Sequence, residues 1–208
     1  MKHVKLFEDF LFEGDPVYGR GTPPSDAIVT KGIADLIKKS PKAKQSVEYC
    51  RQLVDTMRGF GTDESKIYSI FSKIKTKGEM IQIMAIWDMM GLNYDLDDPK
   101  IPLGRMAAVA SWLGKKITGT SDAYARQVSN RINLLGRNIK DKLNSLDFWN
   151  KADTRAADAY YKERAAWFKK NPSQQNTSLF YWIREELDSE ELAKVNGIIK
   201  KFGMKISS

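Results

Sequence analysis

Residues 42–74 read KAKQSVEYCRQLVDTMRGFGTDESKIYSIFSKI, and this stretch decides the fold class. Its first half repeats apolar side chains at spacings of three and four, which is the period of one face of an α-helix. Those side chains are Val47, Cys50, Leu53, Val54 and Met57. Gly59–Gly61 interrupts the pattern, Thr62 is then a favourable N-cap, and acidic residues follow where the helix dipole favours negative charge. The stretch therefore predicts a helix over 42–58 and, after a glycine corner, a second helix that Thr62 caps.

The rest of the chain continues this helical pattern, and no segment has the alternation of apolar and polar residues that a strand would show. Further helices are predicted at 31–39, 77–90, 106–113, 128–146, 152–170, 179–187 and 192–202. The polar stretches Asn93–Pro102 and Asn171–Thr177 predict a loop and a linker. No segment recurs along the chain. The fold class is therefore predicted to be all-α, a helical bundle without internal repeats.

Residues 1–30 are predicted to stand apart from the folded domain. Residues 1–13 repeat apolar side chains at helical spacing, which predicts a short leader helix. The Gly- and Pro-rich residues 14–30 predict a linker. The remaining residues, 31–208, are numerous enough for one sizeable core and predict a single all-α domain.

The scarcity of reactive residue types excludes several classes of site. The 208 residues include one cysteine, Cys50, and one histidine, His3. These numbers are too low for a zinc site with Cys and His ligands or for a fold held together by disulfides. They also argue against a Ser–His or Cys–His catalytic pair in the core. No apolar run approaches the roughly 18 residues of a membrane helix, and the first residues do not form a secretory signal. We therefore expect a binding or structural protein that works in a cytoplasm or in a particle assembled there.

Four pieces of the chain, taken in order, resemble one annexin repeat. Val54–Glu64, VDTMRGFGTDE, resembles the annexin corner between helices A and B with its Gly-x-Gly-Thr-Asp-Glu run. Ile67–Ile74 resembles helix B, Met80–Met90 resembles helix C, and Ser178–Ser189 resembles the end of helix D. Glu190–Lys201 would then be helix E. The resemblance covers 43–92 and 177–202, so the basic helical block 93–176 would be an insertion between helices C and D. The chain departs from the family in having one repeat, and Ser189 replaces the tail glycine.

The annexin resemblance implies a calcium site at the glycine corner. Glycines let successive carbonyl oxygens turn inward, and Ca²⁺ accepts such oxygens together with a bidentate carboxylate. Matched by position, the implied ligands are the carbonyls of Met57, Gly59 and Gly61 and the carboxylate of Glu186. One carboxylate and neutral carbonyls make a weak site, with a Kd of about 10⁻⁴ M or weaker. The alternative is that Gly59–Thr62 only ends one helix and starts the next, with Glu186 on the surface.

The N-terminal sequence MKHVKLFEDFLFEG resembles the leader of internal head proteins of large tailed phages. Such a leader directs a protein into the prohead, where a protease cuts after glutamate in Leu/Ile-x-Glu. The pattern occurs at Leu6-Phe7-Glu8 and at Leu11-Phe12-Glu13, which implies processing after Glu8 or Glu13. The linker that follows is where a protease can reach the backbone. The alternative is an uncut amphipathic helix that docks on this protein or on a partner.

Positive charge is concentrated in one part of the chain. Arg105–Lys170 carries 14 basic and 6 acidic residues, an excess equal to the net charge of +8 of the whole chain. A candidate basic face on one predicted helix comprises Arg126, Arg131, Arg137, Lys140 and Lys142. Such a face fits non-specific contact with nucleic-acid phosphates, and equally an acidic protein or an anionic lipid surface. The alternative is a solvated helix face beside core aromatic residues.

No set of catalytic groups stands out. The candidate carboxylates, Glu64, Asp95, Asp97 and Asp98, belong to a helix start or a solvated loop, where nothing would raise a pKa for glycosidase chemistry. The run Asp95–Asp98 is not an EF-hand, because it lacks the turn glycine. An enzyme is therefore the less favoured class.

These observations together predict a non-enzymatic phage virion protein, structural or internal to the head, with its basic face toward DNA or an acidic protein. The leader would recruit it, other virion proteins would be its partners, and DNA would bind non-specifically. It would be located in the virion, assembled in the host cytoplasm, and would require no cofactor, with Ca²⁺ bound only weakly. The alternatives are a Ca²⁺-dependent annexin-like binder of anionic membrane and, less favoured, a peptidoglycan-acting hydrolase that uses carboxylates.

Overall fold

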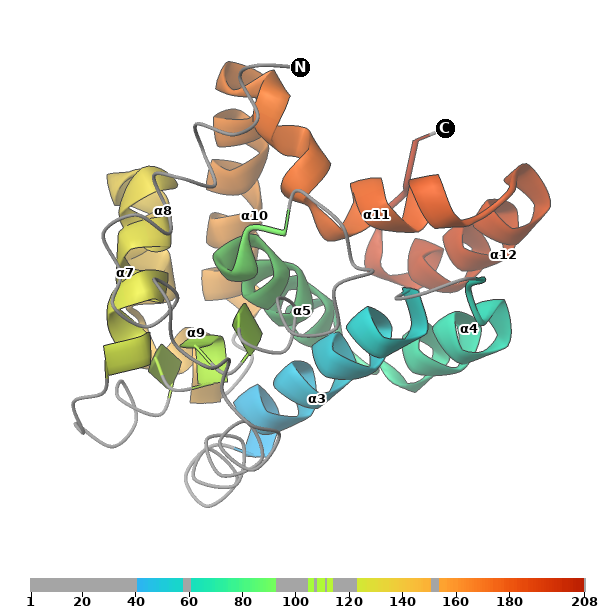
Figure 1. Cartoon of the computed structure of the whole chain (residues 1–208), viewed down its shortest axis with the longest axis horizontal. Coiled ribbons are helices and arrows are strands. Elements are labelled where there is room, and N and C mark those ends of the chain that lie inside the picture. Colours follow the sequence, from blue (N-terminus) through green and yellow to red (C-terminus); the bar gives the residue numbers. More distant parts are fainter. Residues whose placement is uncertain are drawn as a thin grey trace, which may run out of the picture.

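The computed structural model of the chain describes residues 41–57, 61–92, 105–106, 108–110, 112–113, 123–150 and 154–207. These residues form helices and connecting turns without a strand, which confirms the all-α fold class (Figure 1). The predicted leader and linker, the helix at 31–39 and the loop at 93–102 lie outside the described residues. In chain order the elements are α3 (Pro41–Met57), α4 (Glu64–Lys73), α5 (Lys77–Met90), α7 (Ala123–Leu134), α8 (Arg137–Leu143), α9 (Leu146–Asn150), α10 (Thr154–Lys170), the 3-10 helix η1 (Pro172–Thr177), α11 (Leu179–Glu186), α12 (Ser189–Ile199) and the 3-10 helix η2 (Lys200–Phe202).

Helix α5 lies at the centre of the molecule, with α3 and α10 packed against it (Figure 1). Residues 78–90 of this helix are all buried, and its sequence is apolar on almost every side. A helix that is hydrophobic all round belongs in a core. A capping box starts the helix, because the Thr76 hydroxyl accepts the backbone N–H of Glu79 at 3.2 Å while the Glu79 carboxylate accepts that of Thr76 at 3.3 Å. These local signals explain why the prediction for 77–90 is confirmed at both ends.

The predicted glycine corner separates α3 from α4. Helix α3 ends at Met57, and Gly61 has a φ of 87°, a conformation that glycine adopts without strain. The prediction that Thr62 caps the second helix is wrong by one residue, because Asp63 caps α4. Its carboxylate accepts the backbone N–H of Lys66 at 3.0 Å. The Thr62 hydroxyl is thereby left available for a partner outside α4.

The single helix predicted over 128–146 is wrong, because the structure divides this region into α7, α8 and α9. The break before α8 is Gly136. Its φ of 94° and ψ of 161° lie in a region of backbone conformation that is strained for residues with a side chain. A Cβ added at Gly136 would meet no neighbouring atom, so the backbone conformation alone requires glycine. After the break, α8 packs against both α7 and α10.

The C-terminal elements confirm the predicted helices, with one difference. The segment predicted as a linker at Asn171–Thr177 is a 3-10 helix, η1, which Pro172 begins. Helix α12 starts with a capping box in which Asp188 and Glu191 exchange hydrogen bonds. Helix α12 packs against α4, which lies more than 100 residues earlier in the chain. Within the described ranges, no helix has the length and apolar character needed to cross a membrane.

Candidate functional site

Arg131 is not part of an exposed basic face, which corrects the prediction from the sequence. Its side chain is only 4% exposed. Its Nε donates to the carbonyl of Asp88 at 3.2 Å, and its Nη2 donates to the Thr177 hydroxyl at 3.3 Å. A cation is favoured there because the last carbonyls of a helix lack helical partners and carry partial negative charge. Burial lowers the pKa of Arg131, and the charge of Asp88 opposes that shift. Arg131 therefore stabilises the fold.

Arg131 borders a buried polar cluster that the sequence pattern alone does not predict. Asp88, at its centre, is 2% exposed, and its carboxylate accepts the Tyr160 hydroxyl and the Arg164 Nε, each at 2.6 Å. Burial and the charge of Asp88 raise the pKa of Tyr160 well above its ordinary value, so the phenol remains a donor. The available signal is Asp88 itself, an acidic residue near the end of the mostly apolar run from Met80 to Met90, where a carboxylate requires a buried partner. The cluster joins α5 to α10.

Three residues of the predicted basic face lie on α8. Arg137 and Lys140 are exposed and Lys142 is half-buried. The Lys140 Nζ donates to the Asn133 amide oxygen at 2.9 Å. The side chain of Arg126, in α7, lies outside the described part of the structure. Among the described side chains, the residues of the predicted face that reach the surface are therefore those on α8: Arg137, Lys140 and Lys142.

Two neighbouring hollows lie between α8 and α10. Lys142 lines one of about 640 Å³, Arg137 lines one of about 250 Å³, and Glu163 borders both. Helix α10 supplies residues at spacings of three and four, which place them on one helix face. We refer to this surface as the α8–α10 groove, and its charged and aromatic residues are Arg137, Lys142, Arg155, Asp158, Lys162, Glu163, Trp167 and Lys170.

The α8–α10 groove has an excess of positive charge, because five of these side chains are basic and two are acidic. Both acids have partners. The Lys77 Nζ lies 2.6 Å from a carboxylate oxygen of Asp158, and the Asn138 amide donates to Glu163 at 3.1 Å. Among the described residues, the groove cations that form no ion pair are Arg137, Lys142, Lys162 and Lys170.

Three of the groove cations were missed by the sequence prediction. Arg155, Lys162 and Lys170 lie at intervals of seven and eight residues along one predicted helix, which is the signal that places them on a common face. Trp167 also falls within the predicted helix 152–170, but nothing in the sequence places it on this face. Only the packing of α8 beside α10 shows that Trp167 and Lys170 line a hollow with Arg137. The same packing places Arg155 and Lys162 in the hollow that Lys142 lines.

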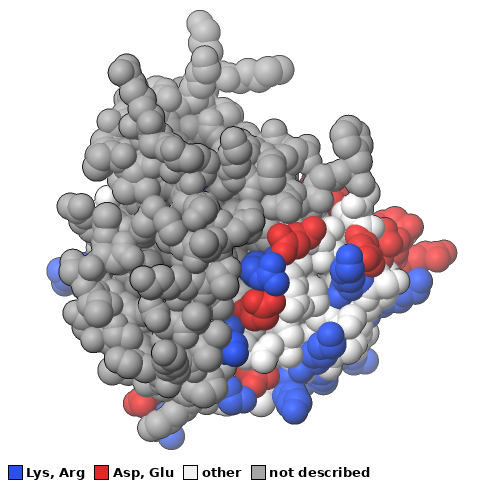
Figure 2. Space-filling model, turned by 60° about the horizontal axis from the view of Figure 1, so that its bottom comes forward, with Lys and Arg blue, Asp and Glu red and all other residues white. Residues whose placement is uncertain are grey.

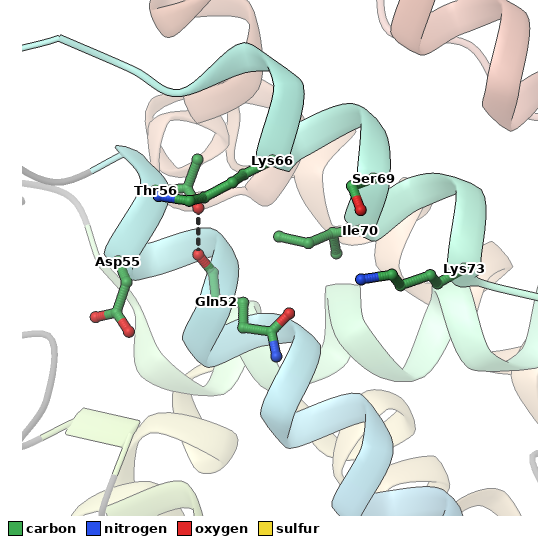
Figure 3. Close-up of a pocket in the computed structure, with 7 residues that line it drawn as sticks. All are labelled: Gln52, Asp55, Thr56, Lys66, Ser69, Ile70 and Lys73. Carbon is green, nitrogen blue, oxygen red and sulfur yellow. Dashed lines mark hydrogen bonds between the residues drawn. The ribbon is translucent and has the colours of Figure 1, made fainter.

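A hollow between α3 and α4 is less suited to an anion (Figure 3). Its volume is about 360 Å³, and it is lined by Gln52, Asp55, Thr56, Lys66, Ser69, Ile70 and Lys73. Lys66 pairs with Asp63 and Asp55 pairs with Arg51, each at 2.9 Å. In Figure 3 the Lys73 ammonium group extends into the hollow near Ile70. The described part of the face in Figure 2 likewise mixes basic with acidic side chains. The larger excess of positive charge is therefore in the α8–α10 groove.

Glu186 lies against the glycine corner. The Thr62 hydroxyl donates to the Glu186 carboxylate, although the two residues are 124 positions apart. Gly61, beside Thr62, is exposed, whereas the side chain of Met57 is buried and Gly59 lies outside the described residues. In the part of the chain that the structure describes, no group of three or more His, Cys, Asp or Glu side chains is placed to hold a metal. Of the implied ligands, Glu186 alone supplies a carboxylate, so the corner fits only a weak cation site built largely from backbone carbonyls.

The other predicted residues lie apart from these sites. Glu8 and Glu13, the predicted processing positions, are outside the described residues, as are Asp95, Asp97 and Asp98. Glu64 lies in the first turn of α4, as the sequence predicts. No protein-family model, curated protein or solved structure matches the chain. Function is therefore inferred from the geometry of the chain's own residues.

Proposed function

We propose that this protein is a non-enzymatic component of a phage virion whose α8–α10 groove contacts the phosphate backbone of nucleic acid. The observation that carries the proposal is five basic side chains along one groove, beside two acids that both have partners. Phosphates bind such a surface through charge, and the release of counterions supplies most of the affinity. The sequence has no helix-turn-helix signature, so the expected binding is non-specific.

The leader supports the virion setting. Residues 1–13 resemble the leaders of internal head proteins, which would recruit the chain into a particle beside other virion proteins. Mass spectrometry of purified particles tests this, with the full chain or a chain cut after Glu8 or Glu13 as the expected species. Absence of the protein from particles would contradict the virion setting and would leave the groove proposal standing.

Removing charge tests the groove. Lys142→Gln/Lys162→Gln removes two groove cations, and Lys200→Gln/Lys205→Gln is the matched control, because those lysines are exposed in the C-terminal segment. Fluorescence anisotropy with single-stranded and with duplex DNA at several salt concentrations gives the dependence of log K on log salt. Each lost phosphate contact lowers that slope by roughly 0.7 for a single strand and roughly 0.9 for a duplex, so the groove variant should lose about 1.5–2 and the control nothing. Equal slopes in the two variants would contradict the proposal, and no binding of either form at low salt would overturn it and favour an acidic protein as the partner.

One contact, between Thr62 and Glu186, favours a second function. It brings the tail carboxylate to the glycine corner, where the annexin resemblance implies Ca²⁺-dependent contact with anionic membrane. The residues that would hold the ion are Met57, Gly59 and Gly61 through their carbonyls, and Glu186 through its carboxylate. The ion would supply positive charge that attracts a lipid phosphate.

Calcium titration tests this second function. Calorimetry and melting temperature at roughly 5 mM Ca²⁺ should show heat and a raised Tm for the wild type, since the expected affinity is weak and only the folded state would bind. Glu186→Gln should abolish both. No heat and no shift in the wild type would remove this function.

A further inference from the structure

We propose that the α8–α10 groove accepts single-stranded rather than duplex nucleic acid, with Trp167 as the platform on which an unpaired base stacks. This inference rests on the proposed function, because it assigns a kind of nucleic acid to the same groove. It starts from the position of Trp167, an aromatic side chain that lines the groove.

Trp167 shares its hollow with basic side chains. It lines the hollow of about 250 Å³ together with Arg137 and Lys170, and it is half-buried. Proteins that bind single strands without sequence preference combine a positively charged groove with aromatic faces, because every base has a π-face and every nucleotide has a phosphate. This hollow presents both components in one place.

The indole of Trp167 packs against the ring of Phe168, which is itself held in place by buried neighbours. The Phe168 ring meets it in a T-shaped arrangement, with centroids 5.0 Å apart and an interplanar angle of 69°. The Arg164 guanidinium lies over the Phe168 ring at 4.5 Å from its centroid, and Asp88 fixes that guanidinium. A side chain that is already ordered loses less rotamer entropy when a ligand stacks on it.

The availability of bases distinguishes a single strand from a duplex at this surface. The bases of a duplex are stacked on one another and are not available to Trp167, whereas those of a single strand can turn toward it. The stretch of α10 from Arg155 to Lys170 spans about 22 Å, which lets an extended strand pass several cations in turn.

Fluorescence anisotropy tests the inference with three probes of equal length: a labelled oligodeoxythymidine of about 20 nucleotides, an abasic sugar–phosphate strand and a DNA duplex. The wild type should bind the oligodeoxythymidine on the order of 10- to 100-fold more tightly than the abasic strand, the range expected for stacking one base on an aromatic side chain. Trp167→Leu should remove most of that difference, and Trp167→Phe should retain most of it. Tyr181→Leu, which removes a half-buried aromatic side chain of α11, is the matched control and should change nothing.

The outcomes separate this inference from the proposed function. Equal affinity for the oligodeoxythymidine and abasic strands, or tighter binding of the duplex, overturns the single-strand inference. The proposed function then stands if Lys142→Gln/Lys162→Gln still weakens binding. Failure of all three probes to bind overturns both. The comparison of the two strands uses the wild-type chain, so it decides the matter even if Trp167→Leu fails to fold by circular dichroism.

Discussion

At the scale of single residues, Asp88 determines how α10 packs against α5. Its carboxylate accepts hydrogen bonds from Tyr160 and Arg164, and its backbone carbonyl accepts one from Arg131. A buried carboxylate needs such partners because desolvation without them costs several kcal/mol. Arg164 also contacts the neighbour of Trp167, so the same cluster supports the proposed stacking platform.

We expect Asp88→Asn to lower the free energy of unfolding by about 3–5 kcal/mol, because Arg164 would remain as a buried charge without a counter-charge. Tyr160→Phe removes one hydrogen bond to the same carboxylate and should cost only about 1 kcal/mol. Urea denaturation followed by circular dichroism measures both. If Asp88→Asn costs no more than Tyr160→Phe, the ion pair does not stabilise the core as described.

At the scale of elements, the turn between α7 and α8 positions the groove. Gly136 ends the line of α7, and Arg137 begins α8 directly after it. Both residues line the hollow that contains Trp167. The direction of α8, and with it the width of the groove, therefore depends on a backbone conformation that glycine alone adopts readily.

Two glycine substitutions should have opposite signs. Gly136→Ala should destabilise the protein by about 1–3 kcal/mol, because alanine is strained at this φ and ψ. Gly197→Ala, within α12 and with open space around it, should stabilise the protein by about 0.5–1 kcal/mol through helix propensity. Thermal and urea unfolding of the two variants provide the comparison. A neutral or stabilising Gly136→Ala would show that α7 and α8 can be joined without strain.

At the scale of the whole molecule, the buried side chains form one core that reaches from α3 to the C-terminal residues. Cys50, in α3, is fully buried within it. Burial, together with the charge of Asp88, raises the pKa of the Cys50 thiol well above its ordinary value. The thiol is therefore protonated and inaccessible while the core is intact.

We expect Cys50 to react with Ellman's reagent only when the whole domain unfolds. In a urea series, the fraction of accessible thiol should follow the same transition as the loss of helix measured by circular dichroism, because one core unfolds as one unit. This measurement also tests the single domain predicted for 31–208. Labelling of Cys50 at urea concentrations that leave the helix signal unchanged would indicate that α3 opens independently.

The helices were predictable because their signals are local. The bounds of α5 follow from its apolar sequence and from the capping box of Thr76 and Glu79. The helix break at Gly136 was not predicted, because the apolar spacing continues on both sides of it. A glycine gives no sign in the sequence of whether its φ is positive or negative. Arg131 was assigned to the wrong environment because its acceptor on Asp88 lies 43 residues away.

By itself, the sequence determined the all-α class, the glycine corner after α3 and the concentration of positive charge between Arg105 and Lys170. These properties depend on composition and on residues a few positions apart. The tertiary structure decided that Arg131 is buried, that Thr62 meets Glu186, and that α8 and α10 form a groove around Trp167. Such contacts join segments far apart in the chain, and their partners are chosen by how the helices pack, which no local pattern encodes.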